Sequence, residues 1–386
     1  MYGRGFWTFK PREYKCIQHK GHRGSRRISC ARAFAGVSDL NLNRNFLETD
    51  FVERSRMRHG RRLRWVPVLF LLYIALCSVG GIYLADGTLH PARRALTGEE
   101  TTALTSTVRT MKAELQEVSI ITADQVILRG WMLRPATNNG NAALVLHGLG
   151  DNRLGMTGYA ELLLAHGYTV LLPDARAHGL SGGELATYGL LERSDIHRWV
   201  DFLLAATHPR CVYGMGESMG AAELLQSLQE DTRFCAVVAE SAFSTFREIA
   251  YDRMGQPFHM GPWVGRILLR PMVEIAFLRV WWKYGLDMEQ VSPEEAVARS
   301  HVAVLLIHGQ IDRNIPVWHS RTIHGAAPQT VLWEVPGADH CGAIAAAPRE
   351  FESRVMGWFE AAMATKATAL TTKGTLRLRS GQAAMH

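Results

Sequence analysis

Residues 216–220 read Gly-Glu-Ser-Met-Gly, and this Gly-x-Ser-x-Gly stretch decides the fold because of what lies on either side of it. The short apolar run 211–214 precedes it and has the composition of a strand, while the run 219–226 has the composition of a helix. A serine on a sharp strand-to-helix turn has a strained backbone and projects its hydroxyl from the end of the sheet. The two glycines leave room for the turn to pack closely. We therefore predict that Ser218 is a nucleophile.

A serine nucleophile needs a base to take its proton and a carboxylate to orient that base. The apolar run 302–307 leads into a loop that contains Asp312, and the run 330–335 leads into a loop that contains His340. Each residue alone is most simply a polar residue on a surface loop. Together they follow Ser218 in the chain order of a Ser-Asp-His triad, and each lies just past a strand.

The N–H groups for a developing oxyanion are also predictable. Acyl transfer needs two backbone donors aimed at the carbonyl oxygen. One is expected from Met219, directly after the nucleophile, and the other from Leu149, in the loop after the apolar run 142–146. His147 stands at the end of that run, and we interpret it as a brace for the loop instead of a catalytic base.

These segments resemble the α/β-hydrolase superfamily, most closely the serine hydrolases similar to serine aminopeptidases and prolyl-oligopeptidase-type catalytic domains. The resembling segments, in chain order, are residues 147–153, 174–183, 216–220, 308–312 and 337–340. The resemblance covers roughly residues 115–362. It implies the α/β-hydrolase fold, a Ser218–His340–Asp312 triad and hydrolysis through an acyl-enzyme, without a cofactor. It implies no particular substrate, because esterases, thioesterases, lipases and peptidases share this fold. One departure is Ala177, where such families usually carry glycine.

The strand and helix patterns agree with a mostly parallel eight-stranded sheet flanked by helices, since strand-like and helix-like runs alternate from residue 115 onward. The predicted strands are 116–122, 126–133, 142–146, 169–172, 211–214, 235–240, 302–307 and 330–335. The predicted helices are 158–166, 190–206, 219–229, 316–325 and 348–364. The hydrolase domain is thus expected to span residues 115–364.

An insertion at residues 244–292, between the sixth and seventh strands, is rich in large apolar residues. A connection of this length inside a compact domain is usually functional, so we predict a helical lid. Its aromatic residues either pack its own helices or line an apolar pocket over Ser218, and the sequence leaves both open.

Residues 65–85 contain no charged residue over 21 positions, which is long enough for a transmembrane helix. The arginines near this stretch are Arg54, Arg56, Arg58, Arg61, Arg62 and Arg64 before it, and Arg93 and Arg94 after it. This bias predicts a cytoplasmic N-terminus and a hydrolase domain on the outer side. We favour an uncleaved signal anchor over a cleaved signal peptide, because no clean Ala-x-Ala site follows.

Charge separates the N-terminal segment from the rest of the chain. Residues 1–64 contain 16 Lys and Arg against 5 Asp and Glu, a net charge of +11, so the +7 of the whole chain leaves −4 for residues 65–386. We predict that the basic segment 1–64 is disordered and attracted to anionic lipids. The segment has no recognisable nucleic-acid-binding motif, so nucleic-acid binding is not predicted. An open alternative is that the protein begins at Met57. Residues 86–114 are expected to be a linker, and 365–386 a disordered tail.

The six cysteines show no spacing typical of a zinc site, so no metal is predicted. Cys211 and Cys235 open strands that should be neighbours, about 4.8 Å apart and within reach of a disulfide. If the domain faces an oxidising compartment, a disulfide between the two is possible. We favour the alternative, in which both cysteines are buried free thiols. Cys341, beside His340, is expected to pack and not to react.

The sequence thus predicts a membrane-anchored serine hydrolase for a small-molecule or peptide acyl substrate. A serine peptidase acting on short peptides is the enzymatic alternative, and it would need a cation- or carboxylate-binding group for a peptide terminus. Nothing in the lid sequence marks such a group, although Glu240 and Arg247 lie near enough in the sequence to be considered. A non-catalytic membrane scaffold that keeps the fold is the alternative of another class.

Overall fold

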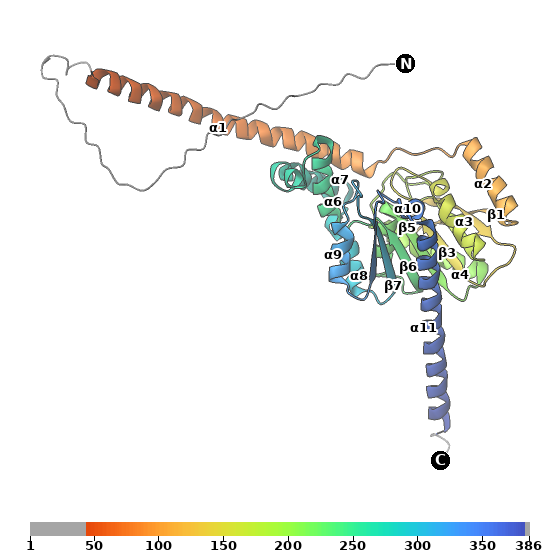
Figure 1. The fold of residues 1–386 in the computed structure, drawn as a ribbon. Helices are drawn as coiled ribbons and strands as arrows, with labels where there is room; N and C mark the ends of the chain where they lie inside the picture. Colours follow the sequence, from red (N-terminus) through yellow and green to blue (C-terminus); the bar gives the residue numbers. More distant parts are fainter. Residues whose placement is uncertain (1–43, 383–386) are drawn as a thin grey trace, which may run out of the picture. The chain divides into compact units, whose positions relative to one another are not determined.

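The computed structural model describes residues 44–382 and contains one eight-stranded sheet with helices on both faces (Figure 1). The strands are β1 (Glu114–Ile121), β2 (Ile127–Arg134), β3 (Ala142–Leu146), β4 (Thr169–Pro173), β5 (Val212–Glu217), β6 (Phe234–Glu240), β7 (Ala303–Gly309) and β8 (Val331–Val335). Their order across the sheet is β1-β2-β4-β3-β5-β6-β7-β8. β2 runs antiparallel to both its neighbours, and β4, β3, β5, β6, β7 and β8 are parallel. The predicted fold class is confirmed.

The helices of the described chain are α1 (Arg44–Leu89), α2 (Gly98–Thr110), α3 (Thr157–Ala165), α4 (Glu192–Thr207), α5 (Ser218–Ser227), α6 (Phe246–Gly255), α7 (Arg270–Tyr284), α8 (Pro293–Arg299), α9 (Trp318–Ala326), α10 (Ala343–Ala346) and α11 (Pro348–Gln382). Short 3-10 helices lie at Arg153–Met156, Gln256–Phe258 and Met288–Gln290, and one π-helical turn lies at Val264–Leu268. The predicted strands and core helices agree with these bounds to within a few residues. The lid insertion is helical, as expected.

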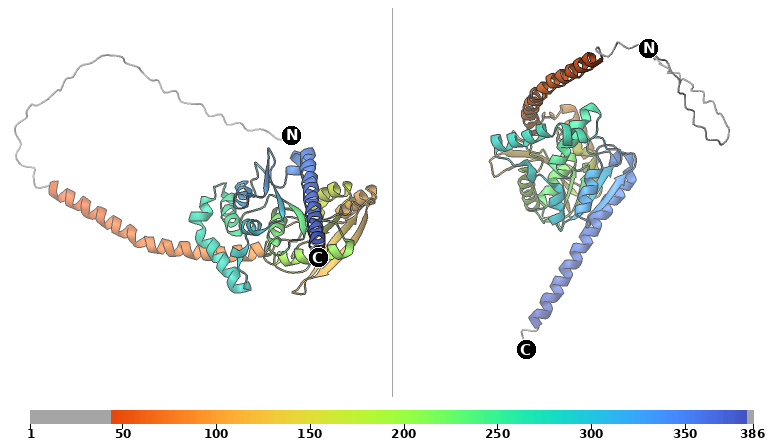
Figure 2. Two further views of the ribbon diagram at one scale, coloured as in Figure 1. Left: turned by 90° about the horizontal axis from the view of Figure 1, so that it is seen from below. Right: turned by 90° about the vertical axis from the view of Figure 1, so that its left-hand side faces the viewer.

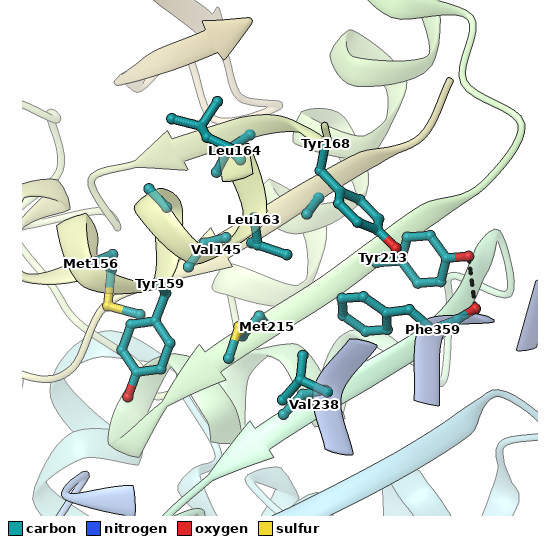
Figure 3. Close-up of a cluster of buried hydrophobic side chains, with 14 of the residues drawn as sticks. Val145, Met156, Tyr159, Leu163, Leu164, Tyr168, Tyr213, Met215, Val238 and Phe359 are labelled. Carbon is teal, nitrogen blue, oxygen red and sulfur yellow. Dashed lines mark hydrogen bonds between the residues drawn. The ribbon is translucent and has the colours of Figure 1, made fainter. Parts of the chain in front are cut away.

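Two apolar clusters cover the two faces of the sheet, because the central strands are buried on both sides. One cluster joins the sheet to α2, α3 and α11, and the other joins it to α4, α5, α8 and α9. Figure 3 shows part of the first, in which Tyr213 of β5 stacks on Phe359 of α11 at a centroid distance of 4.2 Å. The Tyr213 hydroxyl donates to the Phe359 carbonyl oxygen (3.0 Å), so this buried ring has a partner for its polar end.

The chain divides into two compact units, residues 1–66 and 67–386. In the first unit, the described residues form the beginning of α1; residues 1–43 of the predicted disordered segment lie outside the described residues. The second unit holds the sheet, the lid insertion and residues 67–89 of α1. Residues Trp65–Leu89 are long and apolar enough to cross a membrane.

Three segments differ from the expected organisation. Residues 44–64 are helical instead of disordered. The expected linker 86–114 is structured, because α2 fills much of it and the residues before α2 bond to the catalytic domain. The Ala186 N–H donates to Leu89 O (2.9 Å), and Asn152 Nδ2 donates to Arg94 O (3.1 Å). The expected tail is helical as far as Gln382, since no proline interrupts the run that continues α11.

Cys211 and Cys235 form a disulfide with a Cα–Cα distance of 5.7 Å, so the favoured interpretation of two free thiols is wrong. The register between β5 and β6 shifts between the pairs Val212↔Phe234 and Tyr213↔Ala236, which leaves Cys235 as an extra residue on β6. Sequence spacing does not reveal such an irregularity. In the described part of the chain, Cys77 and Cys341 are free.

This disulfide closes a loop over a sequence separation of 24 residues. Loop-closure entropy then predicts that the double variant Cys211→Ala/Cys235→Ala loses about 3 kcal/mol of unfolding free energy. Urea unfolding of the full chain in detergent, with and without reductant, measures this. Reductant should destabilise the unmodified chain to the level of the double variant and leave the double variant unchanged. Equal stability of the unmodified chain in both conditions would contradict the prediction.

Candidate active site

The turn from β5 to α5 places Ser218 at the carboxyl end of the sheet. Ser218 is the first residue of α5, and its φ of +51° lies in the left-handed region, as expected for a nucleophile elbow. A Cβ at Gly216 would lie 2.6 Å from Gly220 O, and a Cβ at Gly220 would lie 2.6 Å from Leu146 O. Neither contact is possible for a real Cβ, so both glycines are required by close backbone packing.

Three predicted residues form one hydrogen-bonded chain. His340 Nε2 lies 3.0 Å from Ser218 Oγ, and His340 Nδ1 lies 2.8 Å from Asp312 Oδ2. The three residues come from the loops after β5, β7 and β8, because the carboxyl ends of parallel strands meet at one edge of the sheet. The arrangement has the geometry of a nucleophile, a base and an orienting carboxylate.

The carboxylate of Asp312 is buried but well satisfied. Its Oδ1 accepts hydrogen bonds from the backbone N–H groups of Asn314 and Ile315 (both 2.8 Å), and its Oδ2 lies 3.4 Å from His308 Nε2. Burial acts to raise the pKa of Asp312, but His308, His340 and the Ile315 N–H outweigh it and hold the pKa well below its usual range. Asp312 therefore stays ionised. It can stabilise the imidazolium that forms when His340 takes a proton.

A second buried carboxylate fixes the loop that carries His340. Glu240, at the end of β6, accepts the Tyr159 hydroxyl (2.8 Å) on one oxygen and the Ala343 N–H (2.9 Å) on the other. Ala343 begins α10, three residues after His340. Glu240 thus anchors this loop and has no exposed oxygen for a peptide terminus, since the residue is 1% exposed.

The expected oxyanion donors, Leu149 and Met219, line the same cavity as Ser218. Met219 is in the first turn of α5, where backbone N–H groups have no partner within the helix. His178 Nε2 accepts the N–H of Gly150 (3.1 Å), and His147 Nε2 accepts the N–H of Ala175 (3.0 Å), so both imidazoles brace the loop after β3. Burial and the neighbouring His178 lower the pKa of His147 to about 4, which keeps it neutral. The interpretation of His147 as a brace is confirmed.

The loop after β4 supports the same region. Asp174 accepts from Arg153 Nη2 (2.6 Å), from the Arg153 N–H (2.9 Å) and from the Leu180 N–H (2.7 Å). Ala177 has a φ of +60°, which explains why glycine is usual at this position. Alanine here is strained but lies away from the hydrogen-bonded chain.

Ser218 opens into a cavity of about 340 Å³ with a mainly apolar lining. The lid insertion contributes residues of α6 and α7, among them Phe246, Phe277 and Val280. The carboxyl-terminal end of α1 forms another wall with Leu84, Ala85 and Leu89. Some lid aromatics thus line the pocket, while others remain exposed.

Sequence reasoning missed three parts of this cavity. The end of α1 was expected to be only an anchor. Tyr188 lines the cavity, and its hydroxyl donates to Thr88 O (2.9 Å), which ties α1 to the catalytic domain. Arg253 of α6 is the charged residue of the lining; it donates to Gln256 Oε1 (3.1 Å) and forms no ion pair within residues 44–382. No pattern in the sequence marks these residues, because they belong to segments with no motif.

Two further expectations concern Arg247 and Cys341. Arg247 bonds to Glu274 (2.6 Å) and Glu289, so it is already neutralised and is not free to bind a peptide carboxylate. Burial, followed by the charges of Glu217 and Glu240, raises the pKa of the Cys341 thiol, so it stays protonated and unreactive.

Comparison with known proteins identifies the family of the chain. Residues 143–354 match the Alpha/beta hydrolase family, and the chain belongs to this family. It is 30% identical over 195 residues to the uncharacterized protein YqkD of Bacillus subtilis. The match covers 49% of this chain and 61% of YqkD, so the chain spans less than two thirds of that relative. It is 23% identical over 273 residues to the uncharacterized peptidase YuxL of Bacillus subtilis, covering 64% of this chain and 38% of YuxL.

Among solved structures, the chain is similar to an esterase of Pyrococcus furiosus with a TM-score of 0.55 and 25% sequence identity. The alignment covers 70% of this chain and 98% of the esterase. The chain thus has the family and the fold of the α/β hydrolases.

Glu217 precedes the nucleophile, and the pKa of its carboxyl is raised above the usual value. Burial, followed by the charges of Glu240 and Asp151, raises the pKa of Glu217 to about 7. The folded chain keeps this proton up to about pH 7, whereas an unfolded chain releases it near 4.5. The contribution of Glu217 to stability therefore falls between these two pH values and stays constant above them.

The variant Glu217→Gln mimics the protonated side chain. It should match the unmodified chain in unfolding free energy near pH 4.5 and exceed it by up to about 3 kcal/mol at pH 8. Urea unfolding at the two pH values measures the difference. Glu114→Gln, at an exposed position on β1, controls for the loss of one charge. A Glu217→Gln effect that is the same at both pH values would contradict the assignment.

Proposed function

We propose that the protein is a membrane-anchored serine hydrolase that cleaves carboxylic ester or related acyl bonds. The observation that supports this most strongly is the chain Ser218–His340–Asp312, with contacts of 3.0 and 2.8 Å, at the base of an apolar cavity. The apolar lining favours the acyl group of a hydrophobic acid.

Acylation follows from the geometry of these groups. His340 Nε2 takes the proton of Ser218 as Oγ attacks the substrate carbonyl carbon, which forms a tetrahedral oxyanion. The N–H groups of Leu149 and Met219 donate to that oxyanion. The C–O bond to the leaving group then breaks, and His340 returns its proton to the departing alcohol. Asp312 accepts from Nδ1–H throughout and stabilises the imidazolium without taking its proton.

Deacylation uses the same groups with water as the nucleophile. His340 takes a proton from water, hydroxide adds to the acyl-enzyme carbonyl, and collapse breaks the bond to Ser218 Oγ. The proton returns to Ser218, and the carboxylic acid leaves. The balance is one ester and one water converted to one acid and one alcohol.

The anchor is proposed to be Trp65–Leu89, with the N-terminus in the cytoplasm and the catalytic domain on the outer side. The length and hydropathy of this helix support a span, and the six arginines at positions 54–64 support the orientation. The Cys211–Cys235 disulfide supports an oxidising compartment for the catalytic domain.

Labelling of the full chain in membranes with a fluorophosphonate probe tests the triad. The unmodified chain should be labelled, whereas Ser218→Ala should not be, and His340→Ala should react only weakly. Ester hydrolysis should fall roughly 10⁶-fold in either variant and roughly 10⁴-fold in Asp312→Asn.

Ser106→Ala and His301→Ala, both at exposed positions, are the matched controls and should keep the activity of the unmodified chain. Absence of labelling in folded, unmodified chain would contradict the triad and favour the non-catalytic scaffold.

A peptidase is the second candidate. The similarity to YuxL favours it, as does Arg253, which has no carboxylate partner among residues 44–382. A series of p-nitrophenyl esters of increasing acyl length, compared with aminoacyl amides, separates the two. An esterase should show kcat/KM that rises with acyl length as the cavity fills and should cleave amides poorly. A preference for aminoacyl amides, lost in Arg253→Met, would contradict the esterase and favour the peptidase.

A further inference from the structure

The lid and the membrane-type helix are packed side by side. Figures 1 and 2 show the lid insertion next to the carboxyl-terminal part of α1. The contacts follow both helices in the same direction: Tyr73 donates to Leu268 O, Gly80 faces Met272, and Asp86 pairs with Lys283 (2.9 Å).

Gly81 permits the close approach of the two helices. A Cβ at Gly81 would lie 2.6 Å from Met272 O and 2.9 Å from the Ile275 side chain. Small residues at such contacts are typical of helix pairs in membranes, where packing replaces the hydrophobic effect.

The depth of these contacts constrains the lid. From Tyr73 to Asp86 an α-helix rises roughly 20 Å. A bilayer core of ~30 Å needs about 20 residues of α1. The core cannot shift toward the N-terminus, because Arg61, Arg62 and Arg64 directly precede Trp65. Counted from Trp65, the core extends to about Leu84, so the contacts at Tyr73, Gly80 and Gly81 fall within it. A bilayer around α1 therefore also surrounds the lid beside it.

The outer side of the lid has the exposed apolar surface that a position inside a bilayer requires. Its exposed apolar residues are Met260, Trp263, Ile267, Leu268, Leu278, Trp281 and Trp282, with Ile267 and Trp282 73% and 72% exposed. We call these residues the lid face. Trp281 and Trp282 precede Lys283, which lies at the level of Asp86, and tryptophan is enriched where a membrane meets water.

The charges near the lid face are compensated. The basic residues within 261–284 are Arg266, Arg270, Arg279 and Lys283, and each has a carboxylate partner within 4.0 Å. Charged side chains that enter a membrane are typically paired in this way. A second copy of the chain would also cover apolar residues, but it would not account for the continuity of the lid face with α1.

The cavity over Ser218 lies between these two elements. α1 contributes Leu84, Ala85 and Leu89 to its wall, and α7 contributes Val273, Ala276, Phe277 and Val280. The wall of the cavity is thus built from the same two helices that the bilayer would surround.

We propose that the lid face lies in the bilayer, from its outer surface to about its midplane, and that the substrate is a lipid ester of the outer leaflet, whose acyl chain occupies the cavity walled by α1 and α7. This inference rests on the proposed serine hydrolase function. The ester carbonyl reaches Ser218 Oγ, the acyl chain occupies the apolar cavity, and hydrolysis releases a fatty acid and the alcohol of the lipid. Each methylene that enters the cavity should raise kcat/KM about fourfold until the cavity is full.

The test uses the full chain reconstituted in phosphatidylcholine vesicles that contain a fluorogenic long-chain glycerol ester, with soluble p-nitrophenyl butyrate as a second substrate. Ile267→Asp and Trp282→Asp should lower hydrolysis of the vesicle ester at least tenfold and change butyrate hydrolysis by less than twofold. Ile121→Asp makes the same chemical change at an exposed residue of β1, away from the lid, and should alter neither rate.

Equal effects of the lid variants on both substrates would overturn the proposal. Absence of butyrate hydrolysis in the unmodified chain would instead contradict the serine hydrolase, so the two failures are distinguishable.

A direct measurement of position does not depend on activity. Vesicles with brominated acyl chains should quench tryptophan fluorescence less in Trp281→Phe/Trp282→Phe than in the unmodified chain. No difference in quenching would overturn the proposal. A concentration-dependent dimer in detergent that Trp282→Asp abolishes would also overturn it, because the lid face would then bind a second copy.

Discussion

The active site depends on the close contact between the start of α5 and the end of β3. Gly220 packs against Leu146 O with no room for a side chain, and this contact forces the tight turn that puts Ser218 in the left-handed region. The turn exposes the hydroxyl at the carboxyl edge of the sheet and leaves the Met219 N–H in the unpaired first turn of α5. The other groups of the site are arranged around this fixed point. The His340 imidazole is held by Asp312, and its loop is anchored by Glu240 through the Ala343 N–H. The loop after β3 depends on two buried histidines.

A second feature connects this site to the helix that precedes the domain. The end of α1 is at once a wall of the cavity, a partner of Tyr188 and a packing surface for α7. An anchor joined by a free linker would leave the catalytic domain independent of the membrane. Here the residues after α1 bond directly to the domain, so under the proposed anchoring the position of the membrane and the position of the cavity are linked through backbone contacts. The proposed entry of a lipid chain follows from that link.

The sequence predicted most of the fold because the buried parallel strands are continuous apolar runs and each turn residue lies at a strand end. The same pattern predicted the order and positions of Ser218, Asp312 and His340, which lie as expected at hydrogen-bond distance. The disulfide depended on a register shift between two strands, which spacing does not encode. Arg253 and the α1 wall depended on how the lid insertion folds back on the sheet, and tertiary packing of this kind leaves no local pattern. The helical tail beyond residue 365 shows that polar composition alone is a weak argument for disorder.

The most direct test of the account is a structure of the full chain in a lipid nanodisc after reaction with a long-chain alkyl fluorophosphonate. The account predicts a phosphorus bonded to Ser218 Oγ, a phosphoryl oxygen within hydrogen-bond distance of the Leu149 and Met219 N–H groups, and an alkyl chain that lies in the cavity walled by α1 and α7 and ends on the side of the lipid. An adduct on another residue would contradict the nucleophile. An alkyl chain that runs into bulk water, with the lid face clear of the lipid, would contradict the link between site and membrane.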